Sequence, residues 1–342
     1  MWTLEELNTT LGDSLKVFQD IFNINELGLW ENEKYVLYQN KPLLEIANKH
    51  KITLEKIETI KKDAEKKLLA IRTKRNKPTI DYKIVCSWNA MYITGLLDAY
   101  TALENETYLS KAISLFRFMD NHFIDEKEDL FHSIAHGKRE IKAYLDDYAF
   151  YIQAAINLFE HTGNTYYLNR AKSSTSICFD LFFNTQSSFF YFSDPANALV
   201  TPAFETEDNV IPSSNAIMAL NLQKLGILYD NPYYSLTADK MIAIIVNNID
   251  YGSAYSHWLL AYLYQNNALE LTISGQDAVN TNLNIRKQPL TRSLIFPLKE
   301  ASQIPYFKNI KTGNNETEFH LCENHTCTLP TSNSSLLDQI TF

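Results

Sequence analysis

The chain has 342 residues, of which 45% are hydrophobic and 21% are charged, as in an ordinary folded domain. Its formal net charge of −9 argues against nucleic-acid binding, because neutralising phosphates requires a concentrated basic surface. Its 4 cysteines are too few for a disulfide scaffold, and no apolar run approaches the ~18 residues of a membrane span. No N-terminal signal is visible, so we expect a cytoplasmic protein without membrane or nucleic-acid partners.

The N-terminal part is expected to contain short helices and one long helix. The segment 53–75 is predicted to be this long helix, capped by Thr53, and a linker leads from it to Cys86. The segment "KYVLYQ", which begins at Lys34, is predicted to form a short strand. The basic stretch from Lys49 to Lys83 has helical spacing and is interpreted as a solvated helix face.

The middle of the chain repeats one pattern three times: an apolar helix, a tight turn with an asparagine, and an amphipathic helix. The turn asparagines are Asn105, Asn164 and Asn231. The hairpins are expected near residues 87–122, 146–182 and 213–249. Asparagine suits these turns because its side chain caps the helix that follows. One hairpin cannot bury its own apolar face, so the repeats must stack or close into a ring.

The first helix of each hairpin begins with polar or aromatic residues, in the segments "SWNA", "DDYA" and "SSNA". Ser87, Asp146 and Ser213 are the expected caps. If the first helices point the same way, these entrances lie side by side and form one mouth. The expected lining is Trp88, Asn89, Asp146, Asp147, Tyr148, Ser214 and Asn215. Capping and packing explain each entrance alone, whereas three aligned entrances favour a shared pocket.

Two further segments carry titratable groups close to the predicted mouth. The stretch 187–215 is predicted to form a short β-hairpin and a loop that crosses the mouth. Its residues Glu205, Glu207 and Asp208 are either solvated surface or an acid or base at the mouth. His132 and His136 lie in an extended segment, where they either pack structurally or serve as a metal or proton-transfer pair.

The C-terminal part differs in character from the helical repeats. Residues 1–268 are expected to form the helical array, and residues 269–342 an extension with short strands packed on it. Cys322 and Cys327 flank a turn beside His320 and His325. This spacing lacks a second ligand pair, so we expect no metal, and a packed thiol pair or a labile disulfide is favoured.

Several motifs together resemble the C-terminal half of one family. They are "WTLEELNTTLG", "RNKPTIDYKIVCSWNAMYITGLLDAY", "AYLDDYAFYIQAAINLFEHTGN", "DNVIPSSNAIMALNLQKLG" and "FHLCENHTCTLPTS". The family combines a thioredoxin domain with a helical toroid and includes bacterial YyaL-like proteins and animal spermatogenesis-associated protein 20. The resemblance covers nearly the whole chain. It implies a mainly α fold, an incomplete (α/α)6 toroid of helical hairpins with a small β-containing C-terminal segment.

Such toroids are similar to N-acylglucosamine 2-epimerases and six-hairpin glycosidases, in which a funnel at one end holds the sugar. The resemblance thus implies a carbohydrate pocket with epimerase, isomerase or glycosidase chemistry and no cofactor. Asp146 and Asp147 would be its acid/base candidates. Trp88 would stack on the ligand, Asn89 and Asn215 would bind its hydroxyl groups, and Tyr148 and Ser214 would complete the rim.

The sequence also departs from the family pattern. The thioredoxin-like domain with its Cys-x-x-Cys motif is absent from this sequence, as are the first toroid hairpins with their Pro-His-Phe-Glu-Lys-Met stretch. Ala90 stands where the family has glycine. We therefore expect the chain to be inactive without an N-terminal thioredoxin or half-toroid polypeptide as partner. The alternatives are a non-enzymatic helical binding module for a thioredoxin-like protein, and a remnant without function.

Overall fold

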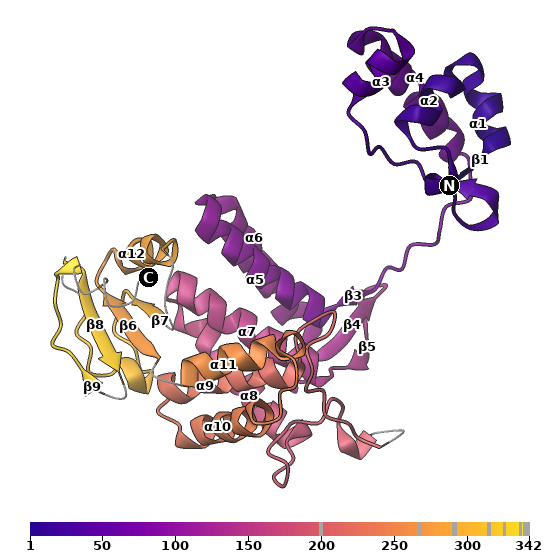
Figure 1. The fold of residues 1–342 in the computed structure, drawn as a ribbon. Helices are drawn as coiled ribbons and strands as arrows, with labels where there is room; N and C mark the ends of the chain where they lie inside the picture. Colours follow the sequence, from indigo (N-terminus) through magenta and orange to yellow (C-terminus); the bar gives the residue numbers. More distant parts are fainter. Residues whose placement is uncertain are drawn as a thin grey trace. The chain divides into compact units, whose positions relative to one another are not determined.

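The computed structural model describes residues 1–197, 201–265, 268–288, 293–312, 316–323, 326–334 and 337. The chain forms two compact units, Met1–Asp81 and Tyr82–Phe342 (Figure 1). Each unit has its own buried apolar clusters, so each can be understood from its own packing. Among the described residues, no helix is long and apolar enough to cross a membrane.

The N-terminal unit consists of four helices and a two-stranded antiparallel sheet. Its elements are β1 (Trp2–Thr3), α1 (Leu4–Leu11), α2 (Leu15–Ile21), β2 (Lys34–Tyr35), α3 (Leu43–His50) and α4 (Leu54–Arg72). The side chain of Thr53 accepts a hydrogen bond from Lys56 N and caps α4, as predicted. Phe18 on α2 is fully buried in a cluster that includes Leu68 of α4.

The helical array of the second unit is built from the three predicted helical hairpins and one further helix. Its hairpins are α5 (Cys86–Leu103) with α6 (Glu106–Phe123), α7 (Leu145–Thr162) with α8 (Thr165–Phe182), and α9 (Ser214–Leu228) with α10 (Pro232–Val246). The further helix is α11 (Ser256–Gln265). Asn105, Asn164 and Asn231 cap the second helices by accepting hydrogen bonds of 2.9–3.1 Å from the second residue after each.

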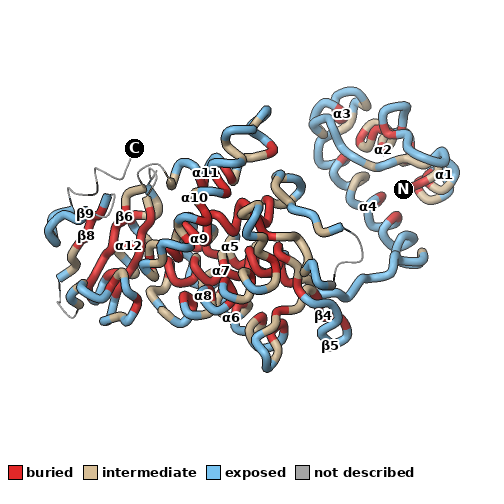
Figure 2. Tube along the Cα trace, turned by 90° about the horizontal axis from the view of Figure 1, so that it is seen from below, coloured by how far each residue is buried: buried red, intermediate tan, exposed pale blue. Residues whose placement is uncertain are grey.

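The first helices of the hairpins form an inner row in the order α5, α7, α9 and α11, while α6, α8 and α10 pack outside them. The central helices α7 and α9 are buried almost all round, which explains why their apolar residues follow no single stripe (Figure 2). Helices α5 and α11 end the row and keep exposed faces. This mainly α arrangement confirms the predicted incomplete α/α toroid.

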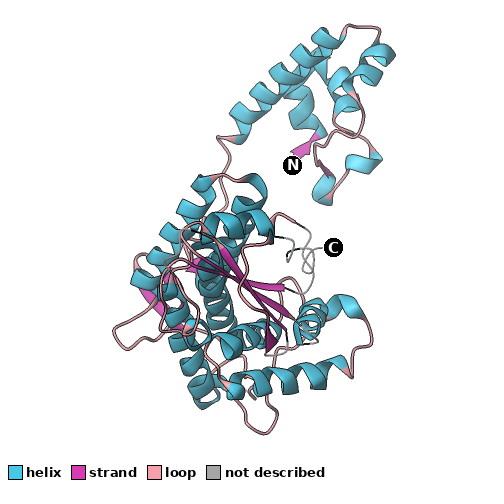
Figure 3. Ribbon diagram, turned by 90° about the vertical axis from the view of Figure 1, so that its left-hand side faces the viewer, coloured by secondary structure: helices cyan, strands magenta, loops and turns pink. Residues whose placement is uncertain are grey.

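Two small sheets accompany the helices of this unit (Figure 3). The three-stranded antiparallel sheet contains β3 (Ile84–Val85), β4 (Phe131–Ala135) and β5 (Lys138–Lys142). The four-stranded sheet has the order β7-β6-β8-β9, formed by β6 (Leu269–Ser274), β7 (Ser293–Leu298), β8 (Glu318–Glu323) and β9 (Thr326–Cys327). Strands β6 and β7 are parallel and are joined through α12 (Ala278–Arg286). Cys322 and Cys327 form a disulfide between β8 and β9, while His325 lies outside the described residues.

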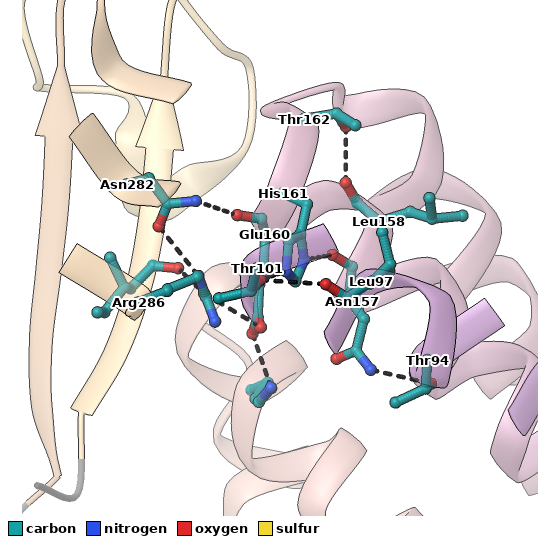
Figure 4. A network of polar contacts seen from close by, with 12 residues as sticks. Thr94, Leu97, Thr101, Asn157, Leu158, Glu160, His161, Thr162, Asn282 and Arg286 are labelled. Carbon is teal, nitrogen blue, oxygen red and sulfur yellow. Dashed lines mark hydrogen bonds and ion pairs between the residues drawn. The ribbon is translucent and has the colours of Figure 1, made fainter. Parts of the chain in front are cut away.

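A polar network joins the four-stranded sheet to the carboxyl ends of the inner helices (Figure 4). Glu160 of α7 is buried and pairs with Lys224 of α9 at 2.7 Å and with Arg286 of α12 at 3.3 Å. Asn282 of α12 donates to the Glu160 carbonyl at 2.7 Å. The residues on both sides of the boundary expected after residue 268 belong to the same compact unit, Tyr82–Phe342.

The segment that crosses from α8 to α9 differs from its prediction. An isolated bridge pairs Phe183 with Phe190, but the described residues 187–197 and 201–213 contain no strand. Backbone groups of Phe190 and Glu205 bond to the side chain of Asn215 at the entrance of α9. The alternating pattern at 187–215 thus reflects a loop that buries its aromatic side chains among the hairpins.

Candidate functional site

The amino ends of the four inner helices meet at one end of the array. Asp147 of α7 accepts hydrogen bonds of 3.0 Å from Ser87 N of α5 and from Tyr144 N, just before α7. Asp208 similarly accepts from Ser213 N, before α9, and from His257 N of α11, both at 2.9 Å. The entrances therefore lie side by side. We refer to this end of the array, which contains Ser87, Asp147, Ser213 and His257, as the mouth.

Asp147 is the central acid of the mouth, and both of its carboxylate oxygens accept hydrogen bonds from the protein. It is completely buried, and its Oδ2 also accepts a 2.9 Å hydrogen bond from the His132 imidazole. The sequence analysis assigned the caps to Ser87 and Asp146. Instead, Asp147 serves two helices, because from the third position of α7 it reaches both Tyr144 N and the neighbouring Ser87 N.

Its neighbour Asp146 differs from Asp147 in its hydrogen bonding and has a raised pKa. Asp146 is buried to 8% exposure, and its Oδ1 has no hydrogen-bond partner among the described residues. Burial, together with the negative charge of Asp147, raises the pKa of Asp146 from 3.8 to about 7. A carboxyl group with this pKa exchanges its proton near neutral pH, which is the property required of a general acid or base.

His132 is the third titratable group of this cluster. Strand β4 carries it, and its ring packs edge-on against Tyr144 at a centroid distance of 5.1 Å. The hydrogen bond that His132 Nδ1 donates to the Asp147 carboxylate raises the pKa of His132. Since Nδ1 faces Asp147, Nε2 is the nitrogen left for a ligand. His136 does not join it but sits at the β4–β5 turn against Tyr82.

His132, Asp146 and Asp147 offer ligand atoms that all lie within 4.8 Å of one another, close enough to hold a metal ion. Both Asp147 oxygens, however, already accept N–H groups, and His132 bonds to one of them. A cation would have to compete with these donors. We therefore describe the cluster as a proton-transfer arrangement.

Two predicted ligand-binding residues stand at the accessible side of the mouth. The Trp88 indole is 66% exposed at the start of α5, as a stacking platform would require. Asn89 is half-buried, and its Nδ2 donates to Val85 O at 2.8 Å. Its amide oxygen is the group left to face a ligand.

Three other predicted ligand-binding residues are used within the protein. The buried Tyr148 hydroxyl accepts from Leu130 N at 3.1 Å. Asn215 is fully buried, and its amide bonds both backbone groups of Phe190 at 2.9 Å. The Ser214 hydroxyl donates to the Glu205 carboxylate at 2.7 Å. These side chains fix the crossing loop and the β4 segment against the helices, a role that depends on distant backbone the sequence does not reveal.

Residues 69–210 match the model of glycosyl hydrolase family 76. This range contains α5 to α8 and the whole Asp146–Asp147–His132 cluster. Together with the shared mouth of the inner helices, the match supports the α/α toroid class for the helical array.

The chain is also homologous to spermatogenesis-associated protein 20, which confirms the expected relationship. It is 20% identical to the human protein over 305 residues, covering 82% of this chain and 38% of that protein. It is 28% identical to the Caenorhabditis elegans protein B0495.5 over 263 residues, covering 70% of this chain and 36% of that one. The chain thus spans little more than a third of the length of these relatives.

Solved structures with a similar trace include a GH76 alpha-mannanase of Bacteroides thetaiotaomicron and a cellobiose 2-epimerase of Bacillus thermoamylovorans. The mannanase is 15% identical with a TM-score of 0.45, and the match covers 75% of this chain and 77% of that chain. The epimerase is 16% identical with a TM-score of 0.42, and the match covers 52% and 50%.

Proposed function

We propose that the mouth is a carbohydrate-directed acid–base site in which Asp146 transfers the proton. The observation that carries this proposal is the buried Asp146 carboxyl, which has an uncommitted oxygen and a pKa near neutrality. The exposed Trp88, in the first turn of α5, suits the apolar face of a sugar ring. The family match across the same residues supports a saccharide as the ligand.

In this proposal the two adjacent carboxyl groups have different roles. Asp147 is a positioning residue, because it cannot attack a substrate without releasing Ser87 N and Tyr144 N. The group that faces Asp146 is then the imidazole of His132. Glycosidases need two free carboxyl groups across the substrate, whereas a carboxyl and an imidazole suit proton transfer next to a carbonyl. We therefore favour a sugar epimerase or isomerase over a glycosidase.

The proposed step balances with these two groups alone. Nε2 of neutral His132 removes the proton from the carbon adjacent to the carbonyl of an open-chain sugar. The C–H electron pair forms the carbon–carbon double bond of an enediol, and the carbonyl oxygen takes the proton of Asp146. Reversal with a proton delivered to the other face, or to the neighbouring carbon, gives the epimer or the isomer.

We further propose that turnover requires an N-terminal polypeptide, a thioredoxin or half-toroid partner. The relatives are much longer than this chain, and both ends of the inner row expose apolar side chains. On α5 these are Trp88, Tyr92 and Leu103, and on α11 they are Leu259, Leu260 and Leu263. The same faces favour the second candidate function, a non-enzymatic helical module that binds a thioredoxin-like protein.

Deuterium exchange tests the enzymatic proposal. D-mannose, D-glucose and cellobiose are incubated in D2O with the chain, alone and together with the N-terminal portion of a relative, and exchange at the carbon next to the carbonyl is followed by NMR. We expect exchange that Asp146→Asn abolishes. Asp180→Asn, an exposed aspartate on α8, is the matched control and should leave exchange unchanged.

Two other outcomes of this experiment would favour a different function. Hydrolysis of a mannoside without exchange would keep a carbohydrate enzyme but remove the epimerase assignment. Stable association of the two polypeptides without any turnover would favour the binding module.

A further inference from the structure

A cavity of about 430 Å³ lies at the opposite end of α9 from the mouth. It is enclosed by the α9–α10 turn, by β6 and by the segment around Tyr306. Since α9 has 15 residues, the cavity is about 20 Å from the entrances that form the mouth. It is therefore separate from the Asp146 cluster and does not depend on the function proposed for it.

The floor of this cavity breaks the pattern expected for its strand. Strand β6 lies between β7 and β8, and a central strand covered on both faces is normally apolar throughout. Leu271 and Ile273 follow this rule on the α12 side. The other face instead presents Glu270, Thr272 and Ser274, all buried. Ser274 bonds to the His320 ring at 3.0 Å, and of these three residues Glu270 is the one that lines the cavity.

The Tyr306 hydroxyl, which lines the cavity, is buried and makes no hydrogen bond of good geometry among the described residues, although the Thr272 hydroxyl and the Glu270 carboxylate lie beside it. A buried hydroxyl without a hydrogen bond costs about 1–3 kcal/mol. Burial, and then the adjacent Glu270 carboxylate, raise the pKa of Tyr306, so its hydroxyl remains a donor. The cavity thus contains one hydroxyl donor, that of Tyr306, beside the acceptor carboxylates of Glu270 and Asp230.

The donor and acceptor groups of the cavity favour some classes of ligand over others. An anion would meet Asp230 and Glu270, and an ammonium offers no acceptor to the Tyr306 hydroxyl. A hydroxyl group both donates and accepts. Leu236, Pro305 and the Tyr306 ring add apolar walls that suit the C–H face of a ring.

We propose that this cavity is a second ligand site, which binds a small neutral polyhydroxylated molecule of monosaccharide to disaccharide size. The Tyr306 hydroxyl donates to the ligand, and the Glu270 carboxylate accepts from it. Asp230 and Ser235 contact it at the rim.

Calorimetric titration of the full chain with D-glucose, D-mannose and cellobiose tests this site. We expect at least one of them to bind, with an affinity about tenfold lower in Tyr306→Phe, which removes one hydrogen bond and leaves the ring. Tyr233→Phe, an exposed tyrosine on α10, should leave this binding unchanged, and Trp88→Ala shows how much of the measured binding takes place at the mouth. Without saccharide, Tyr306→Phe should unfold at the same temperature as the wild type or higher, which shows that its fold is intact.

Three results would overturn the proposal. They are the absence of binding by all three saccharides, binding that Trp88→Ala removes while Tyr306→Phe does not, and binding of spermidine in place of the saccharides. The first would leave the cavity without a ligand of the proposed class. The second would return the binding to the mouth, and the third would assign the cavity to a cation.

Discussion

Two adjacent aspartates at the start of α7 have opposite effects on stability. The pKa of Asp146 is raised from 3.8 to about 7, so the folded state binds more protons than the unfolded state between these values. Its stabilising contribution is complete below about pH 4 and is lost as the pH rises through 7. Asp146→Asn should therefore raise the free energy of unfolding at pH 8, by roughly 2–4 kcal/mol, and change it little at pH 4. Urea unfolding at both pH values measures this, and an equal effect at the two would contradict it.

Asp147→Asn should do the reverse. An amide at this position would turn its NH2 group toward one of the N–H donors that Asp147 now accepts, at Ser87 or Tyr144. We expect a loss of about 2–4 kcal/mol in the free energy of unfolding, together with a lower pKa of His132, which NMR titration can follow. Trp88→Ala is the control at the mouth and should cost little, since the indole is mostly exposed. An unchanged His132 titration would rule out the Asp147 contact.

At the scale of elements, the sequence was informative where the signal is local. Asn105, Asn164 and Asn231 cap their helices because each bonds a backbone N–H only two residues away. The sequence did not predict hydrogen bonds between residues that are far apart along the chain. Asp147 reaches Ser87, 60 residues earlier, and Asn215 holds Phe190, 25 residues earlier. The repeated helix entrances predicted the mouth, but they could not distinguish the residues that face a ligand from those that hold a loop.

The carboxyl end of α7 should make the stability depend on pH in the acidic range. Burial and the charge of Arg286 lower the pKa of His161 from 6.5 to about 4, so the folded state excludes a proton that the unfolded chain binds. The contribution of His161 to stability should therefore fall as the pH drops from about 6.5 to 4, by at most about 3 kcal/mol. His161→Gln cannot be protonated and should flatten this part of the profile in urea unfolding at pH 7, 6 and 5. A variant profile as steep as that of the wild type would assign the effect to other groups.

At the scale of the whole molecule, the two compact units should unfold separately. Their apolar clusters share no residues: Phe18 and Leu68 pack within the first unit, and the hairpin core lies entirely within the second. Phe18→Ala should cost about 3–5 kcal/mol in the first unit, because it removes a fully buried ring. Phe116→Ala, an equally buried ring on α6, is the matched change in the second unit. Scanning calorimetry should show that each variant lowers a different transition, because each removes apolar contacts within its own cluster. A single transition that both variants lower together would mean that the two units unfold cooperatively.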